Sequence, residues 1–315
     1  MRHFFSLCVL SLEALLACGR SEPLPRADVP GRRYPLTVAL PPLSRLTGGE
    51  TLTEGSLTVV AYDAATGLLD AVQTVHGVRS VTLSCTSGEK HIHAFLNEED
   101  AFERPFAREG DEAFRTLSLN FSDSALPFSG AATAQLPLLS SVSVPMRREV
   151  ARVVLGRIRF DLGYYDAARA PVPPVLRAVY LINIPTVLSG GEPGGWLLGR
   201  WHDSATHPLA SDEIGLTLTP GQELYGTAHR FYAFPHDGSA YDSRLVVEMS
   251  LGGHTLYYSV TLPPLQAGKS YEIAELAITR PGSDDPDTPL VLFDQGIRIE
   301  VRDWDSLQLT DGTDF

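Results

Sequence analysis

The stretch Leu57-Thr-Val-Val-Ala-Tyr62 is followed by Asp63-Ala-Ala-Thr-Gly67 and then by a second apolar run over residues 68–75. Val, Thr and Tyr are enriched in strands, whereas Asp and Gly favour turns. The two runs therefore predict two β-strands joined by a short turn. Similar runs recur on both sides of this pair, so strands are expected to build most of the chain.

The other predicted strands are short runs of β-branched and aromatic residues that lie between Gly- and Pro-containing turns. They cover residues 34–40, 78–84, 91–96, 149–160, 175–184, 230–234, 244–250, 255–262, 271–278 and 297–302. Pro35 cannot donate a ladder hydrogen bond, so the strand over 34–40 is expected at a sheet edge. Strands do not alternate with helices, which predicts an all-β fold of antiparallel β-sandwiches.

Two segments do not follow the strand pattern. Asn97 is followed by three acidic residues, which predicts the N-cap and first turn of a short helix that ends before Pro105. Residues 189–219 are rich in Gly and have no apolar period, which predicts a long surface loop.

The length and charge of the chain limit the classes of protein it can belong to. A chain of 315 residues predicts about two domains of ~150 residues each. We place the boundary at Val144-Pro145, giving an N-terminal sandwich over residues 34–145 and a C-terminal sandwich with a tail over residues 146–315. The net charge of −13 argues against nucleic acid as a partner.

The N-terminus carries an export signal. Met1-Arg2-His3 and an apolar run predict a signal peptide over residues 1–17, too short to span a bilayer. Leu15-Leu16-Ala17-Cys18 resembles the bacterial lipobox, in which the cysteine is acylated; the alternative is an ordinary signal peptide beside an accidental cysteine. Residues 18–33 are then a lipidated tether. Cys85 is expected to be a buried small hydrophobe.

The motifs of common enzymes are absent from the sequence, which contains no Gly-x-Ser-x-Gly, His-Glu-x-x-His, Cys-x-x-Cys or Gly-x-Gly-x-x-Gly. We therefore expect no enzymatic activity and no cofactor. His91 and His93 share a strand face and are interpreted as solvated side chains rather than metal ligands. The acidic turn 284–287 has carboxylates of the kind that bind calcium, and this assignment stays open.

Several blocks in the second half form one ordered pattern. They are Val144-Pro-Met-Arg-Arg148-Glu-Val-Ala-Arg152, Phe231-Tyr232-Ala-Phe-Pro235, Arg244-Leu-Val-Val-Glu248, Tyr257-Tyr258-Ser-Val-Thr-Leu-Pro263, Gly268-Lys269-Ser270-Tyr271-Glu-Ile-Ala274, Ile278-Thr-Arg-Pro-Gly-Ser283-Asp-Asp-Pro-Asp287, the run 297–301 and Asp303-Trp304. In the first half, residues 57–62 with their turn and Leu126-Pro-Phe-Ser-Gly130 are weaker matches. Together these blocks resemble the fimbrillin family, which are lipoprotein-precursor pilins with two transthyretin-like β-sandwich domains.

The resemblance implies a structural subunit of cell-surface fimbriae at the outer membrane that supports adhesion and assembles with other fimbrial subunits. A shaft, a tip and an anchor subunit of the fibre stay open. In the family, an arginine-specific protease cuts shaft subunits after their first strand. Arg45 is the candidate site here, with Arg33 as the alternative.

A different class of function is also open. The chain could instead be a surface lipoprotein that binds glycans or another host or bacterial surface ligand. The aromatic side chains that could stack on sugar rings are Trp196, Trp201, Tyr225, Phe231 and Tyr232.

The tail after Trp304 is the candidate donor strand for polymerisation by strand exchange. Leu307, Leu309 and Phe315 share one parity and would face the same way in an extended chain. Asp311-Gly312 interrupts the pattern and can form a turn, and the alternative is a strand that pairs within its own domain.

Overall fold

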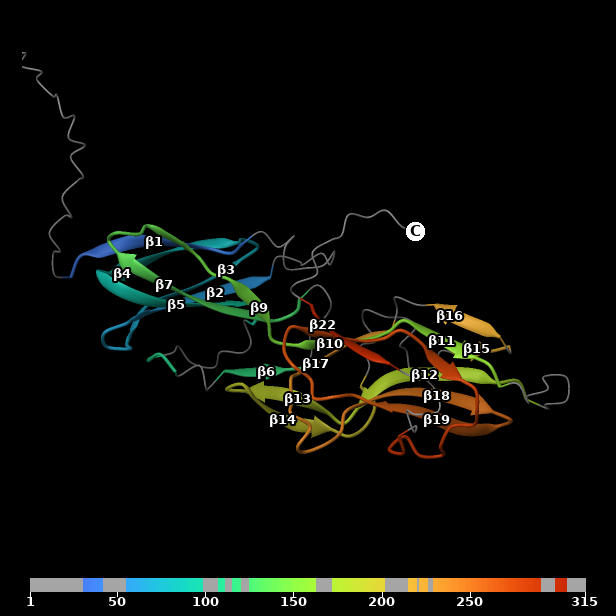
Figure 1. The fold of residues 1–315 in the computed structure, drawn as a ribbon. Helices are drawn as coiled ribbons and strands as arrows, with labels where there is room; N and C mark the ends of the chain where they lie inside the picture. Colours follow the sequence, from blue (N-terminus) through green and yellow to red (C-terminus); the bar gives the residue numbers. More distant parts are fainter. Residues whose placement is uncertain are drawn as a thin grey trace, which may run out of the picture.

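The computed structural model describes residues 31–41, 55–98, 107–110, 115–119, 125–162, 172–201, 215–219, 221–225, 229–289 and 298–304. These residues form strands β1 to β22 and no helix, so none of them belongs to a helix that could cross a membrane. Figure 1 shows two groups of sheets lying one beside the other. The all-β sandwich fold that the sequence predicts is confirmed.

The N-terminal group, called the N-terminal sandwich below, consists of two sheets. The first has the order β4-β1-β8. The second has the order β3-β2-β5-β7-β9. Their bounds are β1 (Arg33–Ala39), β2 (Ser56–Asp63), β3 (Leu69–His76), β4 (Ser80–Thr86), β5 (Gly88–Leu96), β7 (Phe128–Leu136), β8 (Ser141–Ser143) and β9 (Met146–Arg148). Apolar side chains at every second position of β1, β4 and β5 are buried, so the core lies between the two sheets.

The C-terminal group, called the C-terminal sandwich, has three sheets with the orders β17-β10-β20-β22, β16-β11-β21 and β15-β12-β18-β19. Their bounds are β10 (Ala151–Leu155), β11 (Arg157–Phe160), β12 (Val175–Ile182), β15 (Leu216–Thr217), β16 (Gln222–Tyr225), β17 (Arg230–Ala233), β18 (Arg244–Leu251), β19 (His254–Thr261), β20 (Lys269–Ile273), β21 (Leu276–Ile278) and β22 (Ile299–Asp303). Strand β10 pairs in parallel with β20, and β11 does so with β21.

Gly156 explains why the predicted strand 149–160 is two strands. A Cβ at this position would lie 2.8 Å from the carbonyl oxygen of Ala274, between β20 and β21. The backbones of the two neighbouring strand pairs therefore approach each other at their common break, and only glycine allows this approach.

A further three-stranded sheet, β14-β13-β6, joins segments from both halves of the sequence. Its bounds are β6 (Thr116–Ser118), β13 (Ile184–Ser189) and β14 (Glu192–Leu197). The sequence predicts a long surface loop over residues 189–219. This prediction is wrong for residues 192–197, which pair with β13, and for residues 216–217, which pair with β12. The pairing of these short strands depends on a neighbouring strand and not on an apolar period of their own. Residues 202–214 lie outside the described part of the chain.

The first residues of the predicted short helix, Asn97 and Glu98, are described and are not helical. Asn97 has a left-handed backbone with φ of 61°, and its side-chain amide donates to the Leu126 carbonyl at 2.9 Å. It therefore ends β5 in a turn instead of capping a helix. Residues 99–106, on which most of the predicted helix falls, lie outside the described residues.

Trp304, which follows β22, packs where the two sandwiches meet. Its ring is stacked on Tyr232 at 5.6 Å between centroids, and the guanidinium carbons of Arg148 and Arg152 lie 4.1 Å and 4.7 Å from its centroid. Arg148 also lies over Phe128 of β7, at 5.2 Å. This set of five side chains, called the junction stack, connects the N-terminal sandwich with the end of the last described strand.

We predict that Trp304→Ala lowers the free energy of unfolding by about 3–5 kcal/mol, because it removes a fully buried aromatic side chain. Chemical denaturation of the purified protein measures this change. Val301→Ala is the matched control on β22, the strand that Trp304 follows, since Val301 is 51% exposed, and it should change the stability by less than about 0.5 kcal/mol. Equal effects of the two substitutions would contradict a structural role for the junction stack.

Candidate functional site

Strand β1 lies in the middle of its sheet and contributes to the core. It pairs antiparallel with β4 along its whole length, from Arg33 opposite Thr86 to Ala39 opposite Ser80. Leu36 and Val38 are fully buried, and the following Leu40 is 7% exposed. The first described strand of the chain therefore fills part of the core between the two N-terminal sheets.

The prediction that this strand lies at a sheet edge is correct only for its first half. Strand β8 pairs with β1 in parallel, but only over Thr37 to Ala39. Pro35 precedes this pairing and has β4 as its neighbour on one side only. The missing N–H of Pro35 consequently breaks no ladder bond, although the rest of β1 is central.

A buried group of charges lies beside β1. The fully buried Lys90 ammonium donates to the carboxylates of Asp63 at 2.8 Å and Asp70 at 3.0 Å, and to the Thr86 hydroxyl at 2.8 Å. Burial opposes ionisation of the Asp70 carboxyl, but the bonds from Lys90 and Thr86 outweigh it and hold the pKa of Asp70 below its ordinary value. We call these four side chains the Lys90 network.

Arg33, at the start of β1, binds to the outside of this network. Its guanidinium donates to the second carboxylate oxygen of Asp70 at 3.1 Å and to the Ser84 carbonyl at 2.9 Å. Arg33, the alternative protease site, is thus a paired strand residue whose side chain is hydrogen-bonded to both β3 and β4.

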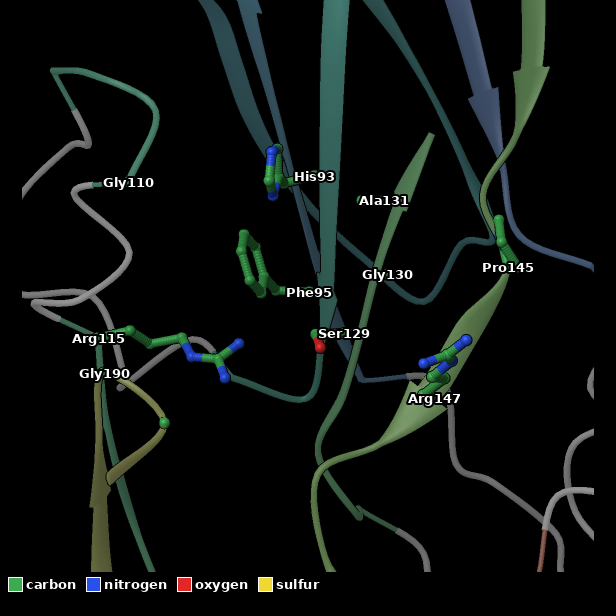
Figure 2. Close-up of a pocket in the computed structure, with 11 residues that line it drawn as sticks. His93, Phe95, Gly110, Arg115, Ser129, Gly130, Ala131, Pro145, Arg147 and Gly190 are labelled. Atoms are coloured by element: carbon green, nitrogen blue, oxygen red, sulfur yellow. The ribbon is translucent and has the colours of Figure 1, made fainter. Parts of the chain in front are cut away.

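A cavity of about 700 Å³ lies on the outer face of the N-terminal sandwich, over β5 and β7 (Figure 2). His93 and Phe95 point into it from β5, and Arg115 reaches it from the segment before β6. Its other lining residues include Ser129, Arg147 and the Gly190-Gly191 tip of the β13–β14 hairpin. Residues from both halves of the sequence therefore enclose this cavity.

Arg115 is paired with two acidic side chains beside the cavity. It lies 3.1 Å from Glu98 and 3.2 Å from Glu149, and its guanidinium carbon is 5.1 Å from the Phe95 ring centroid. Burial raises the pKa of Glu98 to about 8, against the attraction of Arg115 and with a smaller contribution from the charge of Glu149. Because its cation is already paired, the cavity does not present a free positive charge from Arg115 to a ligand.

His91 and His93 do share a strand face, as predicted, but they also share one partner. Glu109 lies 2.8 Å from His91 Nδ1 and 3.3 Å from His93 Nε2, and His93 makes an edge contact with Tyr62 at 5.6 Å. Within the described residues, no group of three or more His, Cys, Asp or Glu side chains is arranged to hold a metal ion.

In the acidic turn after β21, the carboxylates of Asp285 and Asp287 are bonded within the protein. Asp285 accepts hydrogen bonds from the Asp287 amide at 3.0 Å and the Thr288 hydroxyl at 3.2 Å. Asp287 accepts from Asn183 at 3.3 Å and pairs with Arg244 at 3.0 Å. The bonds of Asp287 attach the turn to β18 and to Asn183, which lies between β12 and β13. Together with the bonds of Asp285 they occupy oxygens that a calcium ion would need.

The aromatic side chains considered for glycan stacking lie in different places. Phe231 and Tyr232 are buried in the core, and Trp201 forms an isolated bridge with Leu181. Trp196 lines a second cleft, on the C-terminal sandwich, and the Tyr225 side chain lies outside the described residues. Of the described side chains in this group, Trp196 and Trp201 are thus partly exposed, whereas Phe231 and Tyr232 are buried, and the five do not form one surface.

The remaining candidate site residues cannot be compared with the structure. Cys18, Arg45, Leu307, Leu309 and Phe315 lie outside the described residues. Cys85 is described and is buried on β4, as expected for a small hydrophobe, and burial raises the pKa of its thiol to about 11.

Comparison of the structure finds similar proteins, whereas comparison of the sequence finds none. No protein-family model and no curated protein matches the chain. A candidate cell adhesion protein of Bacteroides eggerthii superposes with a TM-score of 0.64 and 16% identity, covering 88% of this chain and 98% of that one. A second, from Parabacteroides distasonis, has a TM-score of 0.60, 14% identity and coverage of 86% and 96%.

A fimbrilin of Porphyromonas gingivalis superposes with a TM-score of 0.57 and 15% identity, covering 85% of this chain and 96% of that one. At these identities the likeness is one of fold, and it extends over nearly all of each solved chain. The resemblance to fimbrillins that the sequence blocks predict is confirmed at this level: the chain has the fold of fimbrilins and of similar candidate adhesion proteins of Bacteroidetes.

The buried Glu98 predicts a pH dependence of stability. Its folded pKa, about 8, is raised above the ordinary value of 4.5, so its contribution to stability is fully present below pH 4.5 and is lost as the pH rises through about 8. We expect the unfolding free energy of Glu98→Gln to fall less between about pH 6 and pH 9 than that of the unchanged protein. Denaturation at both pH values measures this difference.

The exposed Glu89 provides the control, and Glu89→Gln should retain the original pH dependence. If Glu98→Gln and Glu89→Gln gave identical pH profiles, the Glu98 carboxyl would not be protonated on folding.

Proposed function

We propose that the chain is a structural subunit of cell-surface fimbriae, exported as a lipoprotein precursor and polymerised by donor-strand exchange. The observation that carries this proposal is the position of β1. The first described strand is central in its sheet over Thr37–Ala39, and its Leu36 and Val38 are buried together with Leu40, which follows it. The fimbrilin fold supports the same class of function.

Removal of β1 would leave a site that another strand can fill. The facing edges of β4 and β8 would lose their partner, and the positions of the three buried side chains would become an apolar groove. Unpaired edges of this kind bind an added strand through backbone hydrogen bonds, while alternate side chains set the register.

Arg45 is the proposed cleavage site, because a cut after it would separate β1 from the rest of the chain. A cut after Arg33 would leave six of the seven β1 residues attached, from Tyr34 to Ala39. The pairing of Arg33 with β4 and Asp70 also supports Arg45, since a protease needs an unpaired, extended segment.

The tail that follows Trp304 is the proposed donor strand. It follows Trp304 of the junction stack in the sequence, and Leu307, Leu309 and Phe315 share one parity. Burial of these three side chains would contribute about 5–9 kcal/mol before the entropy of ordering is subtracted, and ladder hydrogen bonds add about 1 kcal/mol net each.

In this proposal the precursor is held at the outer membrane by lipid on Cys18, and its partners are other fimbrial subunits. The proposed subunit has no enzymatic activity. An anchor or tip subunit is the alternative role within the same fibre, and it differs in retaining residues 18–45.

N-terminal sequencing and lipid analysis of the protein from surface filaments test the first step. Cleavage after Arg45 gives a chain that starts at Leu46 and carries no lipid, and this is the expected result for a shaft subunit. A start at Tyr34 would assign the cut to Arg33. A lipidated start at Cys18 would contradict the shaft role and assign the chain as an anchor or tip.

Charged substitutions in the tail test the second step. We expect Leu307→Asp combined with Leu309→Asp to abolish elongation, because both carboxylates would enter an apolar groove, while the monomer remains folded. The control is Gln308→Asp combined with Thr310→Asp, which adds the same charge on the opposite parity and should allow elongation. Filaments from both variants, scored by electron microscopy, would show that the tail is not the donor.

A further inference from the structure

A cleft of about 670 Å³ opens on the C-terminal sandwich, away from β1. Three segments border it: strand β14, the loop 235–240 after β17 and the loop 264–267 after β19. Its apolar wall consists of Trp196 and three prolines, Pro193, Pro235 and Pro264. Clefts with an aromatic wall and a few polar groups are typical of small-molecule binding sites.

The Trp196 ring is held by two aromatic neighbours. The His236 ring lies 5.2 Å from it in a T-shaped contact at 74°, and the Tyr241 ring lies 5.3 Å away at 53°. Trp196 is half-buried and Tyr241 is 42% exposed, so both rings remain partly accessible to solvent. The indole is therefore fixed in place at the wall of the cleft.

His236 is a positioning residue for this wall. Its Nδ1 accepts from the Gly238 amide at 3.1 Å, so Nε2 carries the proton and donates to the Ser243 hydroxyl at 2.8 Å; Ser243 in turn donates to the Asn183 carbonyl at 2.6 Å. Burial lowers the pKa of His236, which keeps the imidazole neutral. Both ring nitrogens are used inside the protein, so they are not available for proton transfer.

The loops of the cleft are also joined to each other. The His236 amide donates to the Leu265 carbonyl at 2.9 Å, which connects the loop after β17 to the loop after β19. Asp237 accepts from the Ser239 amide at 2.8 Å with one carboxylate oxygen, which closes a tight turn at the rim. A ligand would meet a preformed site and would not have to order it.

The polar rim selects the chemistry of the ligand. Glu192, Asp237 and Gln266 border the cleft with four carboxylate oxygens and one amide, and no Lys or Arg is present among its described lining residues. Phosphate and sulfate groups are disfavoured by this charge. Hydroxyl groups suit it, because they donate to carboxylates and both donate to and accept from an amide.

We infer that this cleft binds a neutral saccharide, with a pyranose ring packed on Trp196 and its hydroxyl groups bonded to Glu192, Asp237 and Gln266. The apolar C–H face of a pyranose matches an indole ring, and its equatorial hydroxyls match the acceptor-rich rim. An extended proline-rich peptide would also pack on Trp and Pro, but its carbonyls require donors, which this rim largely lacks. The inference does not depend on strand exchange, because no lining residue belongs to β1 or to the tail.

The test titrates the chain without its predicted signal peptide, residues 18–315, with lactose, cellobiose, mannobiose and N,N′-diacetylchitobiose. Binding is followed by isothermal calorimetry and saturation-transfer NMR. At least one disaccharide is expected to bind with a Kd of about 0.1–10 mM, as suits a shallow open site. Trp196→Ala should weaken this binding at least about tenfold, and Gln266→Ala about fivefold through loss of one hydrogen bond.

Leu198→Ala is the matched control, because Leu198 is 52% exposed, follows β14 and does not line the cleft; it should bind as the unchanged protein does. Gln266→Ala keeps the test valid if Trp196→Ala fails to fold, since Gln266 is an exposed side chain. Absence of binding by all four disaccharides up to about 20 mM would overturn the inference. So would binding unaffected by both cleft substitutions, or Trp196-dependent binding of a proline-rich peptide without saccharide binding.

Discussion

The contact of the Trp304 ring with the guanidinium groups of Arg148 and Arg152 holds the two sandwiches together. A cation over an indole face is stabilised most where water is excluded, and both arginines are buried here. The continuous hydrophobic cluster from Leu36 to Trp304 passes through this point. It fixes the path of the last described strand and the position from which the chain continues.

The Lys90 network beside β1 does not depend on β1 for its ion pairs. The Lys90 network is built from Asp63, Asp70, Thr86 and Lys90, which belong to β2, β3, β4 and β5. Only Arg33 would leave with β1, and its carboxylate partner would retain the Lys90 ammonium. Breaking a buried ion pair is costly because it leaves an unpaired charge, and loss of β1 avoids this cost. The part of the core that would be exposed is apolar, and an apolar strand from another chain could cover it.

The strands could largely be predicted from the sequence, because alternation of apolar residues is a local property. The run 244–250 and β18 (Arg244–Leu251) agree closely, as do 57–62 and β2. Strand β7 was missed because Ser129, Gly130 and the alanines after it have weak strand preference; Gly130 is required since a Cβ would lie 2.1 Å from the Pro145 carbonyl oxygen. The Lys90 network had a visible signal, a lysine on the parity of Ile92 and Ala94, but its partners are brought together only by the fold. The same holds for the surroundings of Trp196, which come from loops about 40 and 70 residues further along the chain.

The full-length pairing of β1 with β4 has a mechanical consequence. Ladder hydrogen bonds run perpendicular to the strands, so a force applied along the strand axis shears the whole register from Arg33–Thr86 to Ala39–Ser80 at once. A force applied across the sheet would instead open the bonds one after another. A strand held in this geometry, whether it belongs to the same chain or to a neighbour, resists tension along its length far better than peeling from its end.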